Sequence, residues 1–510
     1  TGDENTCIGF EAGKAIEGTT ANNTFVGSSA GAGSTTGYEN VALGYRALFG
    51  NVQGRHNVAI GVQALDVANP ASATSTYNTA VGAYAGLGVT TGAENALFGG
   101  FAGRNITTSS YNTFLGYSVG YNNTTGASGT FVGNSAGQGV DGNKLTGDNN
   151  TAIGTRAGLV LQGGATDNTF VGKDAGKAVT EGIQNVFIGS AAGDATANAS
   201  DNVAVGYDAL GANVGGQNNV AIGPRALRDA TVSSGNIYNT AVGSNAGRNQ
   251  SSGIQNTYVG GAAGIHTLTN NYTTFLGVNA GYGGAGSELT GHFNTALGYE
   301  SGFKLITSAT KNTFVGTYAG YFNGTTSTAN GITTGANNTC IGYAAYPSSA
   351  TANNEFTLGD GNVDNLRCND QSISSLSDER DKTNIVDVPL GLDFIKKLRP
   401  VAFDWNRRDG TQEGKKDFGF IAQELKTAQD ATDYADHMRL VHAGTILVPD
   451  NENSNATEDK DGMPIRDVSG TEQECLEADP MKTYPVLVKA VQELSTALDA
   501  ALARIAVLEG

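Results

Sequence analysis

The sequence Asn40-Val41-Ala42-Leu43-Gly44 returns seventeen residues later as Asn57-Val58-Ala59-Ile60-Gly61. The shared motif is Asn, then Thr or Val, then Ala or Phe, then Val, Ile or Leu, and finally Gly. Most copies are spaced by 17 residues, and polar insertions lengthen some spacings to 20 or 21. Clear copies start at Asn5, Asn23, Asn40, Asn57, Asn78, Asn112, Asn150, Asn168, Asn185, Asn202, Asn219, Asn239, Asn256, Asn294, Asn312 and Asn338, and degenerate copies start at Asn95, Gly129, Thr273 and Glu355.

A short fixed period of this kind predicts a solenoid, in which each turn of the chain covers the next. Each motif is rich in β-branched side chains and closes with Gly, which is typical of a short strand followed by a turn. A helix is excluded because Gly recurs every few residues and no apolar stripe of helical period survives. The period is too short for leucine-rich, ankyrin or propeller units, and it favours a coil with two short strands per turn. The repeated Asn is expected to stack as a side-chain ladder.

The third and fourth motif positions predict how the coils assemble. The third position holds Ala or Phe, the fourth holds Val, Ile or Leu, and neighbours on a strand point to opposite faces. Both faces of the strand are therefore apolar, although a lone coil has only one interior. We infer that the outer face meets further copies of the chain in a homotrimer of parallel coils. Twenty turns at about 4.8 Å each would give a shaft on the order of 95 Å long.

The repeat resembles the head region of trimeric autotransporter adhesins, whose Asn-x-[Val/Thr]-Ala-Ile-Gly units build a left-handed parallel β-roll. Similar repeats are found in bacteriophage tail fibres. The resemblance implies a trimeric parallel β-solenoid for residues 1–360, which we expect to form a shaft or head. We expect no outer-membrane anchor at the end of the chain, and in this the chain differs from the adhesins.

Composition and charge argue against several classes of function. The chain has 510 residues, 73 of them Gly, and a net charge of −18. An acidic surface without a basic cluster argues against nucleic acid as a partner. No apolar run is long enough to cross a bilayer and no signal-peptide pattern is present, so we expect no membrane insertion. The chain begins with Thr1, and we expect a processed product or fragment that lacks its N-terminal attachment region.

The four cysteines, Cys7, Cys340, Cys368 and Cys475, do not have metal-ligand spacing. Cys7 and Cys340 occupy the third motif position, and we expect both to be buried small thiols rather than a disulfide. The acidic run at residues 450–461 is interpreted as a solvated loop rather than a metal site. The sequence therefore indicates neither a metal nor a cofactor.

A different set of motifs follows the repeats. Residues 377–382 read Ser-Asp-Glu-Arg-Asp-Lys, and further motifs follow in order at residues 390–393, 398–405, 417–425 and 484–494. This ordered set closely resembles the endosialidase-type intramolecular chaperone domain, a self-releasing C-terminal module of phage tail spikes and fibres. The resemblance covers residues 370–510 and implies a smaller α+β domain. We expect a connector at residues 361–376, the autoprocessing chaperone domain at residues 377–486 and a coiled coil at residues 487–510.

The resemblance implies autoproteolysis of the Leu376–Ser377 peptide bond, with Ser377 as nucleophile and Lys382 as base. The Ser377 hydroxyl lies next to the carbonyl of residue 376, so the attack requires orientation rather than diffusion. Lys382 must lose its proton before it can accept one, and a dry, folded setting favours this loss. We propose that trimer assembly supplies the setting. Asp378, Arg380 and Asp381 are interpreted as a solvated turn that could orient the loop.

Residues 487–508 predict a coiled coil. Apolar residues recur with alternating steps of four and three at Leu487, Val491, Leu494, Leu498, Ala501, Ile505 and Leu508. Three heptads are marginal alone, but they suit a trimeric clamp that sets three chains in register. Parallel pairing over many turns offers many wrong registers, so a register-setting element that is later discarded answers a physical need.

These patterns predict a phage tail fibre that binds a host receptor or forms a shaft, and that is matured by one self-cleavage per chain. Its expected partners are a host surface receptor, which we take to be a polysaccharide, and other virion tail proteins. The expected location is the virion, after assembly in the host cytoplasm.

One alternative is a tail-spike depolymerase, which would need two carboxylates about 5–10 Å apart. The acidic residues of the repeats are few and scattered, as at Asp66, Glu94, Asp174, Asp208 and Glu300. Another alternative is a bacterial trimeric surface adhesin.

Overall fold

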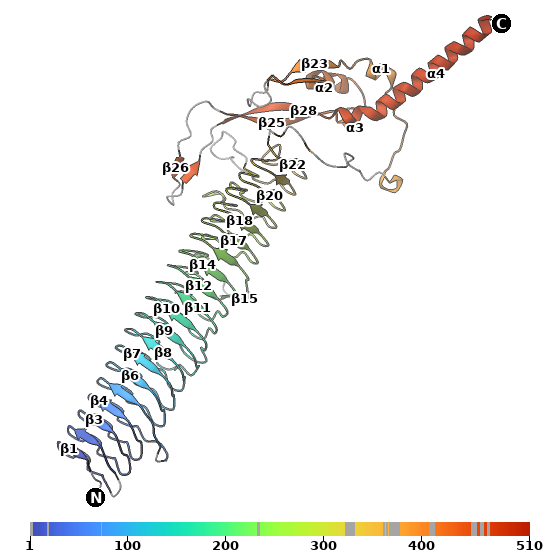
Figure 1. The fold of residues 1–510 in the computed structure, drawn as a ribbon. Helices are drawn as coiled ribbons and strands as arrows, with labels where there is room; N and C mark the ends of the chain where they lie inside the picture. The colour runs from blue at the N-terminus through green and yellow to red at the C-terminus, as the bar shows by residue number, and fades with distance from the viewer. Residues whose placement is uncertain are drawn as a thin grey trace. The chain divides into compact units, whose positions relative to one another are not determined.

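The computed structural model describes residues 4–17, 20–72, 74–231, 235–321, 332–360, 363, 366, 378–406, 414–449, 456–458, 464–466 and 470–509. The chain divides into two compact units, Thr1–Ala319 and Gly320–Gly510. Within the first unit, short strands follow one another in chain order from β1 to β20 as a stack of turns (Figure 1).

The first unit is a parallel β-solenoid built from the repeated motif. Each motif contributes one three-residue strand from its second to fourth positions, and successive strands pair in parallel at equivalent positions, as Ala42 does with Ala59. The strands are β1 (Thr6–Ile8), β2 (Thr24–Val26), β3 (Val41–Leu43), β4 (Val58–Ile60), β5 (Thr79–Val81), β6 (Ala96–Phe98), β7 (Thr113–Leu115), β8 (Thr130–Val132), β9 (Thr151–Ile153), β10 (Thr169–Val171), β11 (Val186–Ile188), β12 (Val203–Val205), β14 (Val220–Ile222), β16 (Thr240–Val242), β17 (Thr257–Val259), β18 (Thr274–Leu276), β19 (Thr295–Leu297) and β20 (Thr313–Val315). The predicted solenoid of turns of about 17 residues is confirmed.

A second strand in every turn is not found among the described residues. Regular second strands occur at β13 (Gly216–Gln217) and β15 (Gly235–Asn236), which pair with each other. Elsewhere this side of the turns carries isolated bridges, such as Leu145 with Gly163. The rest of each turn consists of bends with frequent left-handed residues, which cannot continue an extended ladder. The expectation of two strands per turn is therefore wrong for most turns.

The repeated Asn forms the predicted ladder through buried side chains. The backbone N–H of Asn57 donates to Oδ1 of Asn40 at 3.0 Å, and Nδ2 of Asn40 donates to the carbonyl of Gly54 at 2.9 Å. Asn168 and Asn185 repeat the first contact at 3.1 Å. Each Asn thus joins its turn to its neighbours and satisfies polar groups that the stack would otherwise bury unpaired.

The Gly that closes each motif is required by the backbone. Gly44 has a φ of +135°, and a Cβ placed on it would lie 2.6 Å from the carbonyl oxygen of Gly61 in the next turn. The motif glycines of the neighbouring turns, Gly27 and Gly61, have the same conformation and the same close approach. A residue with a side chain would therefore be strained and would clash with the backbone of the next turn.

The core of the first unit is the column of strand centres, which hold the third motif position. Phe25, Ala42, Phe114 and Phe131 are all fully buried, and the rings of the last two stack with centroids 4.7 Å apart. The third and fourth motif positions lie on opposite faces of the strand, as predicted, and the third position is the one that points into the core. Cys7, at the same position of β1, is exposed and contradicts the expectation of burial, because β1 pairs with β2 along one edge only.

The fourth motif position forms an exposed apolar column on the opposite face of the strands. We name this set the outer column: Val26, Leu43, Ile60, Val81, Phe98, Leu115, Val132, Ile153, Val171, Ile188, Val205, Ile222, Val242, Val259, Leu276, Leu297 and Val315. Leu43 is 46% exposed, Leu115 52% and Leu276 42%. Every member is aliphatic or aromatic and is either exposed or half-buried, so the single chain presents a row of apolar side chains that are at least partly open to solvent.

The second unit opens with two further motif strands, β21 (Thr339–Ile341) and β22 (Phe356–Leu358), which pair in parallel. Its other elements are η1 (Glu379–Asp381), α1 (Leu392–Ile395), β23 (Val401–Asp404), β24 (Lys416–Gly419), α2 (Ala422–Asp430), α3 (Ala435–Met438), β25 (Val441–Pro449), β26 (Ala456–Glu458), β27 (Pro464–Arg466), β28 (Gly470–Ala478), η2 (Pro480–Thr483) and α4 (Tyr484–Glu509). β23 pairs with β24, β25 with β28 and β26 with β27, all antiparallel. The smaller α+β region that the sequence predicts is confirmed.

A small apolar core holds the second unit together. Phe394 of α1, Leu425 of α2, Met438 of α3 and Val486 of α4 are at most 6% exposed and belong to one cluster. The first turns of α4 are therefore packed against the rest of the unit. The predicted helix over residues 487–508 is present within α4, whereas its association into a coiled coil and the predicted domain boundaries stay predictions.

Candidate functional site

The residues after the expected cleavage point form one tight turn, which we name the cleavage turn (residues 378–382). Asp378 caps η1: its Oδ1 accepts the backbone N–H of Arg380 at 2.9 Å. The Arg380 side chain returns to the same carboxylate, with Nε at 2.9 Å and Nη2 at 2.6 Å. These hydrogen bonds lower the pKa of Asp378 and raise the pKa of Arg380. The turn is thus ordered by its own side chains, as the sequence suggests.

Lys382 ends the cleavage turn, and its backbone N–H donates to the carbonyl of Glu379 at 3.1 Å. Leu376 and Ser377 lie outside the described residues, so the arrangement of the Ser377 hydroxyl and the Lys382 amine stays a prediction. All residues from 378 to 389 are exposed in the single chain. The dry setting that the base would need is therefore not present around residues 378–389 of one chain.

The segment that leads from the cleavage turn to α1 is apolar although it is exposed. Ile385 is 62% exposed, Val386 75% and Val388 36%. The segment reaches the folded unit at Gly391, where the backbone N–H of Leu392 donates to Oε2 of Glu493 in α4 at 2.8 Å. The chain between the cleavage turn and α1 is therefore anchored at its C-terminal end by the last helix.

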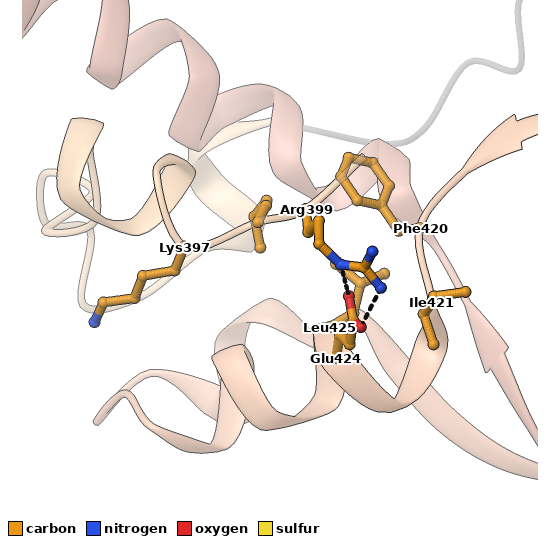
Figure 2. A pocket seen from close by; sticks show the side chains of 7 residues that line it. Lys397, Arg399, Phe420, Ile421, Glu424 and Leu425 are labelled. Carbon is orange, nitrogen blue, oxygen red and sulfur yellow. Dashed lines mark hydrogen bonds and ion pairs between the residues drawn. The ribbon is translucent and has the colours of Figure 1, made fainter. Parts of the chain in front are cut away.

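A shallow pocket lies between the chain after α1 and the start of α2 (Figure 2). Its polar centre is a two-pronged ion pair, in which Arg399 donates from Nε to Oε2 of Glu424 at 3.0 Å and from Nη2 to Oε1 at 2.5 Å. The pair lowers the pKa of Glu424 and raises the pKa of Arg399. Lys397, Leu398, Phe420, Ile421 and Leu425 complete the lining, and both carboxylate oxygens of Glu424 are engaged by Arg399.

Helix α4 exposes the apolar residues that the heptad pattern selects. Val491 is 64% exposed, Leu494 56%, Leu498 58% and Ile505 49%. By contrast, Val486 and Ala490 on its packed side are each 4% exposed. The helix thus has one face against its own unit and a second apolar face open to solvent.

Some acidic side chains of the solenoid are held by arginines, whereas burial, followed by the nearby charge of Asp208, raises the pKa of Asp194. Asp66 forms an ion pair with Arg46 at 3.1 Å and Asp174 forms one with Arg156 at 2.8 Å. Burial raises the pKa of Asp208. Across the ranges that the structure describes, no group of three or more His, Cys, Asp or Glu side chains could hold a metal ion. None of the described helices is long and apolar enough to span a membrane.

Comparison with known proteins bears on the second unit. Residues 377–436 match the family model described as chaperone of endosialidase. No curated protein and no solved structure is significantly similar to the chain. The match begins at Ser377, includes the cleavage turn and extends through α2. It confirms the resemblance of the C-terminal part to this family. A β-solenoid together with a C-terminal segment of this family fits a protein of the phage tail fibre or tail spike type.

Sequence reasoning missed two contacts that shape this unit. Arg399 and Glu424 lie in two of the motifs that carry the resemblance, so their pairing had a sequence signal that was not used. Glu493 lies in the last motif, but its partner Leu392 is 101 residues away. No periodicity links these two positions, and only the fold brings them together.

Proposed function

We propose that the chain is a phage tail fibre protein that assembles as a homotrimer and carries a C-terminal intramolecular chaperone. The observation that carries the proposal is the family match starting at Ser377, directly after a long β-solenoid. In this proposal the solenoid is delivered to the virion. The segment after Leu376 guides assembly in the host cytoplasm and is then released by autoproteolysis.

The proposed cleavage uses one serine and one lysine. The Ser377 hydroxyl attacks the carbonyl of Leu376 while Lys382 accepts its proton, and the peptide C–N bond breaks as that nitrogen is protonated. The resulting ester is hydrolysed by water, which leaves a carboxylate on Leu376 and a free amine on Ser377. The reaction occurs once per chain. Because Lys382 is exposed in one chain, we expect cleavage only after neighbouring copies have excluded water from the turn.

Two apolar surfaces support the trimer in this proposal. The outer column runs along the strands of the first unit, and α4 exposes Val491, Leu494 and Leu498 on one face. A parallel trimer would bury both without a new fold. The helix pattern is the one that parallel coiled coils use. The family match also supports trimer formation, because intramolecular chaperones of this kind act on trimers.

Intact-mass spectrometry of the purified full chain tests the cleavage. We expect one fragment that begins at Ser377 and one that ends at Leu376. Ser377→Ala and Lys382→Ala should remain full length, because one lacks the nucleophile and the other lacks the base. Lys396→Ala, which removes an exposed lysine at the C-cap of α1, is the matched control and should cleave normally. A wild-type trimer that stays uncut would refute the proposed autoproteolysis.

We propose that the solenoid binds a host surface polysaccharide, and other tail proteins of the virion, rather than hydrolysing glycan. The carboxylates of Asp66 and Asp174 are held by arginines, which leaves them poorly suited to act as an acid and a nucleophile. Incubation with host polysaccharide should leave its size distribution unchanged while the protein sediments with host cells. Shortened glycan chains would favour the depolymerase alternative.

A further inference from the structure

Helix α1 begins without a cap of its own. Its N-cap residue is Gly391, which has no side chain to accept the first backbone N–H groups. The missing acceptor comes from α4 instead, where Oε2 of Glu493 accepts the N–H of Leu392 at 2.8 Å. A carboxylate at this end of a helix is also favoured by the helix dipole.

Gly391 makes this approach possible. A Cβ placed on Gly391 would lie 2.5 Å from Cδ of Glu493 and would also collide with both carboxylate oxygens. The absence of a side chain at 391 and the carboxylate at 493 are therefore complementary. The two residues fix the start of α1 against one defined turn of α4.

The same turn of α4 has an exposed apolar side. Val491 and Leu494, which flank Glu493, are 64% and 56% exposed and belong to the heptad positions. Association of three α4 helices would bury these residues and restrain the turn that holds Glu493. Because Glu493 contacts Leu392, the start of α1 would then be restrained too. The segment that runs back from α1 to the cleavage turn would be held at that end.

We infer that Glu493 is a positioning residue that links assembly of α4 to self-cleavage, by anchoring the chain between the cleavage turn and α1. This inference rests on the proposed autoproteolysis. Glu493 is not a catalytic residue, because its described contact is to the backbone of Leu392. Its removal should slow cleavage without preventing assembly.

The test uses the full chain and follows two quantities after refolding: the cut fraction over time by intact mass, and the oligomer by native mass spectrometry. Glu493→Ala should form the trimer but cleave about tenfold more slowly or worse, because small misplacements cost catalysis heavily. Gly391→Ala, which displaces the carboxylate without removing it, should do the same. Glu493→Gln, which can still accept the N–H, should restore cleavage to within about threefold of wild type. Asp499→Ala, which removes another exposed acidic residue of α4, is the matched control and should cleave at the wild-type rate.

Each result is decisive. Wild-type cleavage by a trimeric Glu493→Ala variant would overturn the inference. Loss of the trimer in that variant would overturn it too, since Glu493 would then act in assembly. A wild-type chain that never cleaves would refute the proposed function, whatever residue stands at 493. A second measurement avoids cleavage altogether: in the Ser377→Ala background, Glu493→Ala should speed hydrogen exchange at Leu392 about tenfold, and unchanged exchange would count against the anchor.

Discussion

At the scale of single residues, the side chain at the strand centre of several turns of the solenoid is matched in size by the residue four positions beyond the motif Gly. Ala42 is accompanied by Leu48, whereas Phe114 is accompanied by Gly120, where a Cβ would collide with the Phe114 ring. The same exchange pairs Ala59 with Leu65, Ala204 with Leu210 and Ala221 with Leu227, but Phe131 with Gly137, Phe170 with Gly176 and Phe187 with Gly193. In these turns the small and the large side chain alternate between the two positions, whereas in the turn of Ala80 and Gly86 the side chains of Leu65 and Leu97 from the neighbouring turns fill the space.

The free energy gained by burying Leu48 outweighs the cost of its backbone conformation. Leu48 adopts a φ of +54°, a left-handed conformation that costs a branched residue about 1 kcal/mol. Burial of a leucine side chain contributes about 1.5–3 kcal/mol, so Leu48 is favourable beside Ala42 in spite of its backbone conformation. Where the strand centre is Phe, as at Phe114, the ring occupies the space that a leucine side chain would need.

Gly99 and Gly100 offer a direct test of the motif Gly. Gly99 has a φ of +127° and a Cβ on it would collide with the carbonyl oxygen of Gly116. Gly99→Ala should therefore lower the free energy of unfolding by about 2 kcal/mol or more. In Gly100→Ala the nearest atom would be a Tyr117 ring carbon at an ordinary 3.5 Å, so stability should change little. Chemical denaturation compares the two variants, and equal midpoints would contradict the stacking argument.

At the scale of elements, the Arg399–Glu424 pair fixes α2 against the chain that enters β23. Both side chains are substantially exposed, so the pair contributes modestly to stability and more to orientation. Its two parallel hydrogen bonds define the angle between the two segments better than one contact could.

The pair predicts acid sensitivity of the second unit. The pKa of Glu424 is lower in the folded unit than in the unfolded chain, because Arg399 holds its charged form. The contribution of the pair is therefore complete above the unfolded value, near 4.5, and is lost as pH falls through the lower folded pKa. Glu424→Gln should flatten the decline of the melting midpoint between pH 5 and pH 3. Arg399→Lys, which loses the two-pronged geometry, should flatten it partly, and a slope identical to wild type in both variants would exclude this role.

The elements also show what could be predicted from sequence. The strands, and the opposite faces to which Ala42 and Leu43 point, follow from the repeat, because alternation along a strand is a local property. The single strand per turn does not follow, since the αL residues that bend the chain, such as Glu39 and Arg46, have no distinctive composition. The contact between Leu392 and Glu493 joins distant segments and has no periodic signature. For the cleavage site, the turn around Asp378 and Arg380 is present, while the geometry of Ser377 stays a prediction.

At the scale of the whole molecule, the outer column is an uncovered surface of unusual length. The largest apolar patch on a typical monomer covers roughly 300–600 Å², and it is commonly functional. The outer column has seventeen apolar residues, of which Leu43, Leu115 and Leu276 are each more than two-fifths exposed. Contact with other copies would cover it along its length.

A charge in this column should therefore disrupt assembly. Leu115→Asp would place a carboxylate inside the proposed dry interface at a cost of roughly 2 kcal/mol or more per chain. We expect the trimer fraction, measured by light scattering after size-exclusion chromatography, to fall markedly. Ser128→Asp is the matched control, because Ser128 is exposed on another column, where Asp167 and Asp201 already occur with the same backbone conformation. An undisturbed Leu115→Asp trimer would place the interface elsewhere.

The ladder of Asn side chains gives the solenoid the properties of a ruler. Most turns offer their successor the same hydrogen-bond acceptor, the same glycine gap and the same strand edge as they received, although Gly129 and Thr273 replace the Asn in two turns. Duplication or excision of a seventeen-residue unit would therefore lengthen or shorten the solenoid by one turn, about 4.8 Å, without requiring a new kind of contact between turns. A gene built in this way could adjust the reach of its product by recombination between its own repeats.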